Sequence, residues 1–461
     1  MVLGGCAGLV PQHSGEPPAM DIPANWSSSS DGTRSGDANQ PDWWRQFNDP
    51  QLTALVERAL AANTDIQGAL AALRQARALV TVANANLLPL VDGSASAQRN
   101  KTAATPGSSL FRAGFDASWE PDLFGANRAG LHAAKADASA SVASLGDVQV
   151  SIAAEVAAAY MQWRGTRVRL DVARENLALQ QETLQIAQWR AQAGLGTSLE
   201  VEQARAAAEQ TSAQIPALES TLAQTASSIA VLTGRAPAAL PELANAGAGD
   251  PPVAPDAIAL AIPADTLRQR PDIRRAEEQV RAAAARATQA DAQRFPSFTL
   301  SGNIGLSALT LGALGASSAG VAALLAGVSV PIFNGGALTA RVEAQDAALQ
   351  AAGAAYQGSV LIALKDVEDS LVGLRSALQR RDTLQRAVEA AGNASLIARV
   401  RYQGGVIDFQ TVLDTQRTQL NTQDSLAAAR TDVATAQVRL VKALGGGWNS
   451  DTVAVQTARL P

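Results

Sequence analysis

The sequence predicts a mainly α-helical chain with a membrane β-barrel portion, built from two structural repeats that each combine a β-hairpin with long coiled-coil helices. Three observations predict this fold. The chain repeats itself with an offset of about 210 residues. Each repeat has two strand-like segments after a proline and then continues into a very long helical run. Apolar residues in these runs step by four and three, the spacing of coiled coils.

The composition excludes several classes of function. The chain has 461 residues and a formal net charge of -5, so no basic field attracts nucleic acid. Aromatic residues make up only 4% and alanine is abundant, which favours long, thin, closely packed helices. With two histidines, His13 and His132, and one cysteine, Cys6, the sequence excludes a disulfide framework and makes a His/Cys metal site improbable.

The N-terminus resembles the end of a lipoprotein signal followed by a tether. Leu3-Gly4-Gly5 directly precedes Cys6, as in bacterial signals whose cysteine is lipidated, although the basic and apolar parts of a signal peptide do not precede it. Acyl chains on Cys6 would anchor the chain in a lipid bilayer; the alternative is a free cysteine in a disordered end. The Pro-, Ser- and Gly-rich sequence that follows has no periodicity and is typical of a tether.

Prolines and glycines mark the limits of the expected parts. In chain order these are the signal remnant and tether at 1–41, the first repeat at 42–236 with strands at about 90–119 and a long helix pair at 127–233, a Pro-rich linker at 237–263, the second repeat at 264–447 with strands at about 297–331 and a long helix pair at 337–444, and a C-terminal tail at 448–461. The first helix of each pair would extend roughly 100 Å.

Three local signals refine this division. Asp49-Pro50 is a typical helix start, with Leu52 and Leu55 on one face of the helix that follows. Pro216 is expected to kink the second helix of the first pair, because proline lacks the backbone donor that the helix needs. Gly234 is expected to end that helix.

The strand-like segments alternate apolar and polar residues, as outer-membrane strands do. Phe111, Phe115 and Trp119 share one face of the second strand, and Phe298 opens the third. A hairpin in a soluble α+β domain would show the same alternation, and the charge-free segment between Arg294 and Arg341 also permits a pair of poor membrane helices. Four strands cannot enclose a pore, so strands placed in a membrane require several chains to share one barrel.

The chain resembles the TolC/OprM-type outer-membrane efflux factors, and among them the lipoprotein (NodT-type) branch paired with RND pumps. The motifs that carry the resemblance are Leu3-Gly4-Gly5-Cys6, Trp43-Trp44, Trp119-Glu120-Pro121-Asp122-Leu123-Phe124-Gly125, Ile262-Pro263, Arg270-Pro271-Asp272-Ile273 with Glu277, Phe295-Pro296 and Val330-Pro331-Ile332-Phe333-Asn334-Gly335. The resemblance implies a homotrimer whose 12-stranded β-barrel is continued by a periplasmic α-barrel. It also implies a periplasmic adaptor protein and an inner-membrane RND transporter as partners, and the outer membrane of a Gram-negative bacterium as the location.

The glycine turns between the long helices are implied to form the end that faces the adaptor. The residues assigned to these turns are Gly194, Gly196, Thr197, Gly404, Gly405 and Val406. The resemblance also implies a periplasmic gate beside the second turn. Its candidate residues are Tyr402, Asp408, Thr411 and Asp414.

The candidate gate departs from the family pattern at two positions. Thr411 stands where a second gate aspartate is usual and Ile407 where a network arginine is usual, so Asp408 is considered as a substitute. A three-fold ring of Asp414 would bring like charges together at a constriction and draw cations. The plainer interpretation of Asp414 is a solvated aspartate near Arg417.

These observations predict an outer-membrane exit duct of a tripartite RND-type efflux pump, which passively conducts drugs or other small toxic molecules. The alternative within the same class is the outer-membrane channel of a type I protein secretion system. An enzyme is not expected, because no phosphate loop, HExxH or GxSxG motif occurs. A structural coiled-coil protein would need neither the strands nor the lipid signal. No cofactor is expected beyond the covalent lipid on Cys6.

Overall fold

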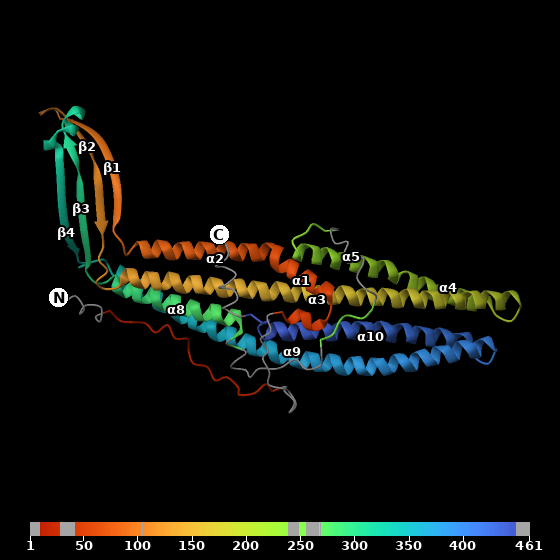
Figure 1. Ribbon diagram of the computed structural model, residues 1–461. Helices are drawn as coiled ribbons and strands as arrows, with labels where there is room; N and C mark the ends of the chain where they lie inside the picture. The colour runs from red at the N-terminus through yellow and green to blue at the C-terminus, as the bar shows by residue number, and fades with distance from the viewer. Residues whose placement is uncertain are drawn as a thin grey trace. The chain divides into compact units, whose positions relative to one another are not determined.

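The computed structural model describes residues 10–27, 42–102, 105–237, 249–254, 267 and 269–448. Figure 1 shows long helices and a single sheet. The elements of the first half are a 3₁₀ helix (Trp43–Phe47), α1 (Pro50–Ala62), α2 (Thr64–Ala85), β1 (Leu90–Thr102), β2 (Thr105–Trp119), α3 (Ala126–Gln192), α4 (Ser198–Ser212) and α5 (Gln214–Leu232). Those of the second half are α8 (Pro271–Ala292), β3 (Ser297–Ala308), β4 (Gly320–Ser329), α9 (Ala337–Gln403) and α10 (Phe409–Ala443).

The predicted strands and long helices are confirmed. All four expected strands form, and the predicted run 337–403 coincides with α9. The interruption expected from Pro216 is present: the helix after the first turn is divided into α4 and α5, which are separated at Ala213. Pro216 explains the break, because its ring excludes a helical hydrogen bond and clashes with the carbonyl of Ser212, where α4 ends.

The chain divides into two compact units. The first contains Met1–Met20, Leu70–Ser144 and Asp272–Ser359. Its strands form an antiparallel sheet in the order β1-β2-β3-β4, so the middle pair β2–β3 joins the two repeats. In this unit the N-terminal strap, residues 10–20, lies along α8 and α9: the His13 imidazole contacts Asp291 at 2.9 Å and Asp346 at 3.6 Å.

The second unit contains Asp21–Ala69, Leu145–Pro271 and Val360–Pro461. Its start is organised by Asp49, which caps α1 by accepting from the backbone N–H groups of Gln51 and Leu52. The other carboxylate oxygen accepts from the Tyr160 hydroxyl at 2.9 Å and from Arg164 at 3.2 Å, both on α3. The predicted helix start is therefore confirmed, and it is also the point where α1 is fastened to α3.

Polar side chains join α3 to α10 within the second unit. Gln416 donates to Thr183 at 2.8 Å, and Asn176 donates to Gln423 at 2.7 Å. Arg169 forms a two-pronged ion pair with Asp424. Polar pairs at a helix seam fix its register, because a sliding helix would leave them unsatisfied.

Both 67-residue helices, α3 and α9, contain an 18-residue window that is apolar enough to cross a membrane. The α3 window is 44% buried within the protein. Since a helix of this length rises about 100 Å, more than three times the hydrocarbon thickness of a bilayer, length and composition alone do not identify either as a membrane span.

Candidate functional site

The two glycine turns have the same backbone hydrogen bonds. At the end of α3, the N–H of Gly194 donates to Ala191 O and that of Leu195 to Arg190 O. At the end of α9, the N–H of Gly405 donates to Tyr402 O and that of Val406 to Arg401 O. This pair of hydrogen bonds is the Schellman motif, which requires one residue in the left-handed conformation. Gly194 and Gly405 supply that residue, each with a φ of +72°.

Each turn passes into a capped helix. The Thr197 hydroxyl accepts from the backbone N–H of Glu200 at the start of α4. The Asp408 carboxylate accepts from the backbone N–H of Thr411 at 2.7 Å and from its hydroxyl at 2.7 Å, at the start of α10. Thr197 and Asp408 thus occupy the same place in the two repeats, and both orient the helix that leaves the turn.

Tyr402 lies at the centre of a cluster that joins the two turns. Its hydroxyl donates to Glu200 Oε2 at 3.0 Å. The Arg190 guanidinium carbon lies 4.7 Å from the centre of the Tyr402 ring, and its Nη1 donates to Tyr402 O at 3.4 Å. The Phe409 ring packs against the same ring at 5.2 Å. Tyr402, at the end of α9, is therefore contacted by α3, α4 and α10.

The electrostatics of this cluster favour a neutral phenol. Burial raises the pKa of the Tyr402 hydroxyl, and its hydrogen bond to the Glu200 carboxylate raises it further. Asp408 behaves in the opposite way: the hydrogen bonds from Thr411 lower the pKa of its carboxyl. At neutral pH the cap of α10 is therefore an ionised carboxylate, the form that a helix N-terminus prefers.

The remaining candidate gate residue, Asp414, lies outside this cluster. Asp414 is exposed on α10 and accepts a hydrogen bond from Gln410 at 3.1 Å. Ile407, at the position where a network arginine was expected, packs against the apolar cluster around Tyr402 and Phe409. Within one chain, Arg190 supplies the guanidinium beside the tyrosine instead.

Sequence reasoning missed Arg190 and Glu200. Their local signals were present: Arg190 is a basic residue in the last turn of α3, and Thr197 with Glu200 has the spacing of a capping box. In a capping box, the glutamate side chain would accept a hydrogen bond from the backbone N–H of the N-cap residue, here Thr197. The contact of Glu200 with Tyr402, 202 positions away, follows only from the packing of the two hairpins.

The apolar tips of the turns are exposed. Leu195 is 70% exposed, Leu199 65% and Val406 71%. Three large apolar side chains at helix ends are costly to hydrate and are typical of a surface that binds another protein.

The predicted strand aromatics lie on the two inner strands of the sheet, β2 and β3. Phe115 is 62% exposed on β2, where Phe111 lies on the same face. Trp119 donates from its indole N–H to Leu87 O at 3.0 Å, at the join between α2 and β1. Phe298 is the second residue of β3, and its ring stacks with that of Phe124, with 6.4 Å between the ring centres. The sheet thus has an exposed apolar face within one chain.

Cys6, the predicted lipidation site, lies outside the described residues. Across the ranges that the structure does describe, no group of three or more His, Cys, Asp or Glu side chains is arranged to hold a metal ion.

Comparisons with known proteins agree on one family. The family described as outer membrane efflux protein matches residues 55–235 and 262–446. The pyoverdine export outer membrane protein OpmQ of Pseudomonas putida KT2440 is 32% identical over 95% of this chain and 94% of its own. The solvent efflux pump outer membrane protein SrpC of Pseudomonas putida is 30% identical over 97% of both chains. The solved outer-membrane channel OprN superposes with a TM-score of 0.86 at 33% identity, over 94% of this chain and 100% of its own.

Proposed function

The chain belongs to the outer membrane efflux protein family, and from this membership we propose that it is the exit duct of a tripartite RND-type pump, a passive conduit rather than an enzyme. The predicted family and outer-membrane location are thereby confirmed. The observation that carries the proposal is the pairing of a four-stranded, outwardly apolar sheet with hairpins of 67-residue helices in one chain.

The two open edges of the sheet support a closed oligomer, which is proposed to be the family's trimer. Among the residues that the structure describes, β1 and β4 each pair on one side only, and an unpaired edge is not tolerated in lipid. The edges of neighbouring chains satisfy each other if β4 of one subunit pairs with β1 of the next. Three chains then form the 12-stranded barrel.

The internal repeat fixes the register of this closure. Leu90 opposes Ser118 in the first hairpin and Ser297 opposes Ser329 in the second. Equivalent residues of the two repeats are therefore separated by 207 positions in sequence between β1 and β3, and by 211 positions between β2 and β4. The internal pair Ala117–Gly302 then corresponds to Val328 opposite Ala95 of the neighbouring subunit.

The faces of the strands agree with this register. Ala95 opposes Ala113, on the β2 face that carries Phe115. Val328 opposes Phe298, on the same apolar face of β3 and β4. At this seam, a register shifted by one residue would place the apolar face of one strand beside the opposite face of the other.

Disulfide trapping in membranes tests the closure. The pair Ala95→Cys with Val328→Cys should give covalently linked trimers under oxidation, because directly opposed strand residues lie within disulfide reach. The matched control is Ala97→Cys with Val328→Cys, a diagonal pair about 7–8 Å apart. Equal linking in both pairs would reject the register, and linking in neither would reject the trimeric barrel.

The gate is assigned to the second turn and its neighbours. Tyr402 supplies the centre of the network and Asp408 and Thr411 orient the start of α10. Asp414, which is exposed on α10, would contribute one carboxylate from each chain to a three-fold ring. Gly194, Gly196, Thr197, Gly404, Gly405 and Val406 form the surface for the periplasmic adaptor, supported by the exposed tips at Leu195 and Val406. Asp414→Ala should lower cation selectivity in planar bilayers; unchanged single-channel behaviour would remove Asp414 from the gate.

A lipid on Cys6 would hold each subunit at the outer membrane. The support is the Leu3-Gly4-Gly5-Cys6 sequence. Cys6→Ser in the full precursor should abolish labelling with palmitate, and persistent labelling would exclude Cys6 as the acceptor.

The cargo is proposed to be small toxic molecules. The relatives named for pyoverdine export and solvent efflux favour small-molecule efflux over type I protein secretion. A deletion strain should become sensitive to antibiotics or solvents, whereas loss of a secreted protein with unchanged sensitivity would favour secretion.

A further inference from the structure

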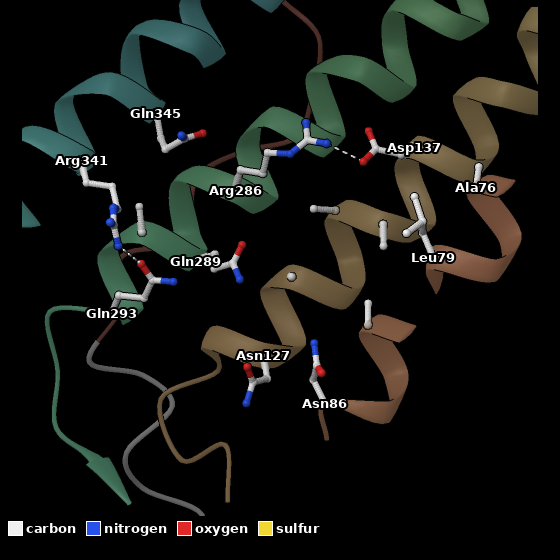
Figure 2. Close-up of a pocket in the computed structure, with 15 residues that line it drawn as sticks. Ala76, Leu79, Asn86, Asn127, Asp137, Arg286, Gln289, Gln293, Arg341 and Gln345 are labelled. Atoms are coloured by element: carbon white, nitrogen blue, oxygen red, sulfur yellow. Dashed lines mark hydrogen bonds and ion pairs between the residues drawn. The ribbon is translucent and has the colours of Figure 1, made fainter. Parts of the chain in front are cut away.

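The first unit contains a polar recess between four helices. Its volume is about 530 Å³, and side chains of α2, α3, α8 and α9 line it (Figure 2). Asn86 lies one residue after α2, and Asn127 at the start of α3. The recess therefore lies at the strand-to-helix junction, immediately next to the sheet along the chain.

Eight of the fifteen lining residues are polar, and the others are small or apolar. Five lining residues are Asn or Gln, two are arginine and one is aspartate. Arg286 of α8 pairs with Asp137 of α3. Arg341 of α9 donates to the side-chain oxygen of Gln293 at 3.2 Å, a neutral acceptor, as Figure 2 shows. The lining thus carries one more positive than negative charge.

The recess and the N-terminal strap lie on opposite faces of two helices, α3 and α8. The strap packs at Arg281 and Thr288 of α8, where Gly15 and His13 make contact. The recess is lined by Arg286 and Ala290, which lie roughly half a turn away from Arg281 and Thr288 around α8. On α3, Arg128 and His132 line the cavity beside the strap, whereas Gly130 and Asp137 line the recess.

This opposition assigns the recess to the lumen, an assignment that rests on the proposed duct. A strap that leads to the proposed lipid on Cys6 would run outside the barrel, since the anchoring lipid surrounds it. The opposite face of α3 and α8 then lines the channel. Three copies would place three Arg341 guanidinium groups and three Arg286–Asp137 pairs around the lumen just below the strands.

We propose that this recess is an anion-binding station on the lumenal wall, which attracts the carboxylate, sulfonate or phosphate groups of solutes in transit. A guanidinium group recognises such oxyanions with paired hydrogen bonds, and neighbouring amides supply further donors. Because the charge is only one unit per copy and the site is open, binding is weak enough for release, as conduction requires.

Ion selectivity in planar bilayers tests the proposal with three variants of the full chain. Arg341→Gln should raise the potassium-to-chloride permeability ratio about twofold or more in a 10:100 mM potassium chloride gradient, where charges are weakly screened. Asp137→Asn should lower the ratio, because it frees the Arg286 charge. Both effects should vanish near 1 M salt, where the screening length is about 3 Å.

Arg281→Gln is the matched control. Arg281 and Arg286 lie on the same helix, each pairs with a carboxylate, and their side chains are 44% and 45% exposed. Removing Arg281, on the strap face, should leave selectivity unchanged. If the wild-type channel conducts but Arg341→Gln leaves its selectivity unchanged, the anion-binding role of the recess is rejected while the duct stands. Equal shifts in selectivity for Arg341→Gln and Arg281→Gln would reject that role as well. A wild-type chain that does not conduct would overturn the proposed duct.

Discussion

The Tyr402 hydroxyl donates a 3.0 Å hydrogen bond to the Glu200 carboxylate, which fastens the end of α9 to the start of α4. The two residues belong to different repeats, so this bond makes the two turns one structural piece within a subunit. A motion that separates the two hairpins must break this hydrogen bond, whereas a motion that keeps it must move both hairpins together.

Tyr402→Phe should loosen the closed state of the channel. The change removes one hydrogen bond to a half-buried carboxylate, a loss of about 1 kcal/mol, or roughly a fivefold shift in a two-state equilibrium. Single-channel recording should show a higher open fraction or conductance. Glu202→Gln is the control, because Glu202 lies on the same helix but pairs with Arg205 on the exposed side. A closed channel as tight as wild type would show that the bond does not restrain opening.

The same bond should be insensitive to pH over the physiological range. The folded-state pKa of Tyr402 lies above its ordinary value of 10.0, so its contribution is complete below about pH 10 and is lost as pH rises through the raised value. Conductance controlled by this bond should therefore be flat between pH 6 and 9. A change in that window that persists in Tyr402→Phe would have to come from other groups.

The second turn offers a comparison between adjacent glycines. Gly405 has φ of +72°, whereas Gly404 does not adopt a left-handed conformation and an added Cβ there would meet its nearest atom at 3.6 Å. Gly405→Ala should cost about 1 kcal/mol, because a side chain strains this conformation. Gly404→Ala should leave the stability of the turn unchanged. Limited proteolysis at the turn should be about fivefold faster in Gly405→Ala alone; equal rates in both variants would contradict the strain argument.

Asp49 should be a strong stability determinant of the second unit. Asp49→Ala removes the cap of α1 and leaves Arg164, whose side chain is 11% exposed, without its carboxylate. The expected loss is about 3 kcal/mol, because breaking a buried pair leaves an unbalanced charge. Burial also raises the pKa of Tyr160 to about 12, so its hydroxyl remains a donor to Asp49 at neutral pH.

Urea unfolding of the detergent-solubilised protein measures this loss. Asp42→Ala is the control, because Asp42 pairs with Arg45 in an exposed site and should change stability by less than about 0.5 kcal/mol. Equal midpoints for the two variants would show that the Asp49 cluster does not stabilise the unit.

The parts that the sequence predicted are those set by local signals. The limits of α9 follow from Pro331 and the glycines around it at one end and from Gly404 and Gly405 at the other, because glycine and proline act on their own neighbourhood. The Tyr402 cluster could not be predicted in the same way. Arg190 and Glu200 look like ordinary helix-end residues, and their role depends on how two hairpins pack.

The pair Gly114–Gly305 on β2 and β3 should be essential for the sheet. The two residues oppose each other, and a Cβ on Gly114 would lie 2.6 Å from the Ile304 carbonyl oxygen. Because that atom belongs to the backbone of the partner strand, no rotamer change relieves the clash. Gly114→Val should therefore separate the two repeats within the sheet and prevent membrane assembly.

Assembly is measured as the heat-modifiable trimer fraction in outer membranes. Gly93→Val is the matched control on β1, where an added Cβ would meet the Phe115 side chain only at 3.7 Å. Valine favours strands, so this control should assemble as well as wild type. If Gly114→Val assembled equally well, the close approach of β2 and β3 would not be what holds the two repeats in one sheet.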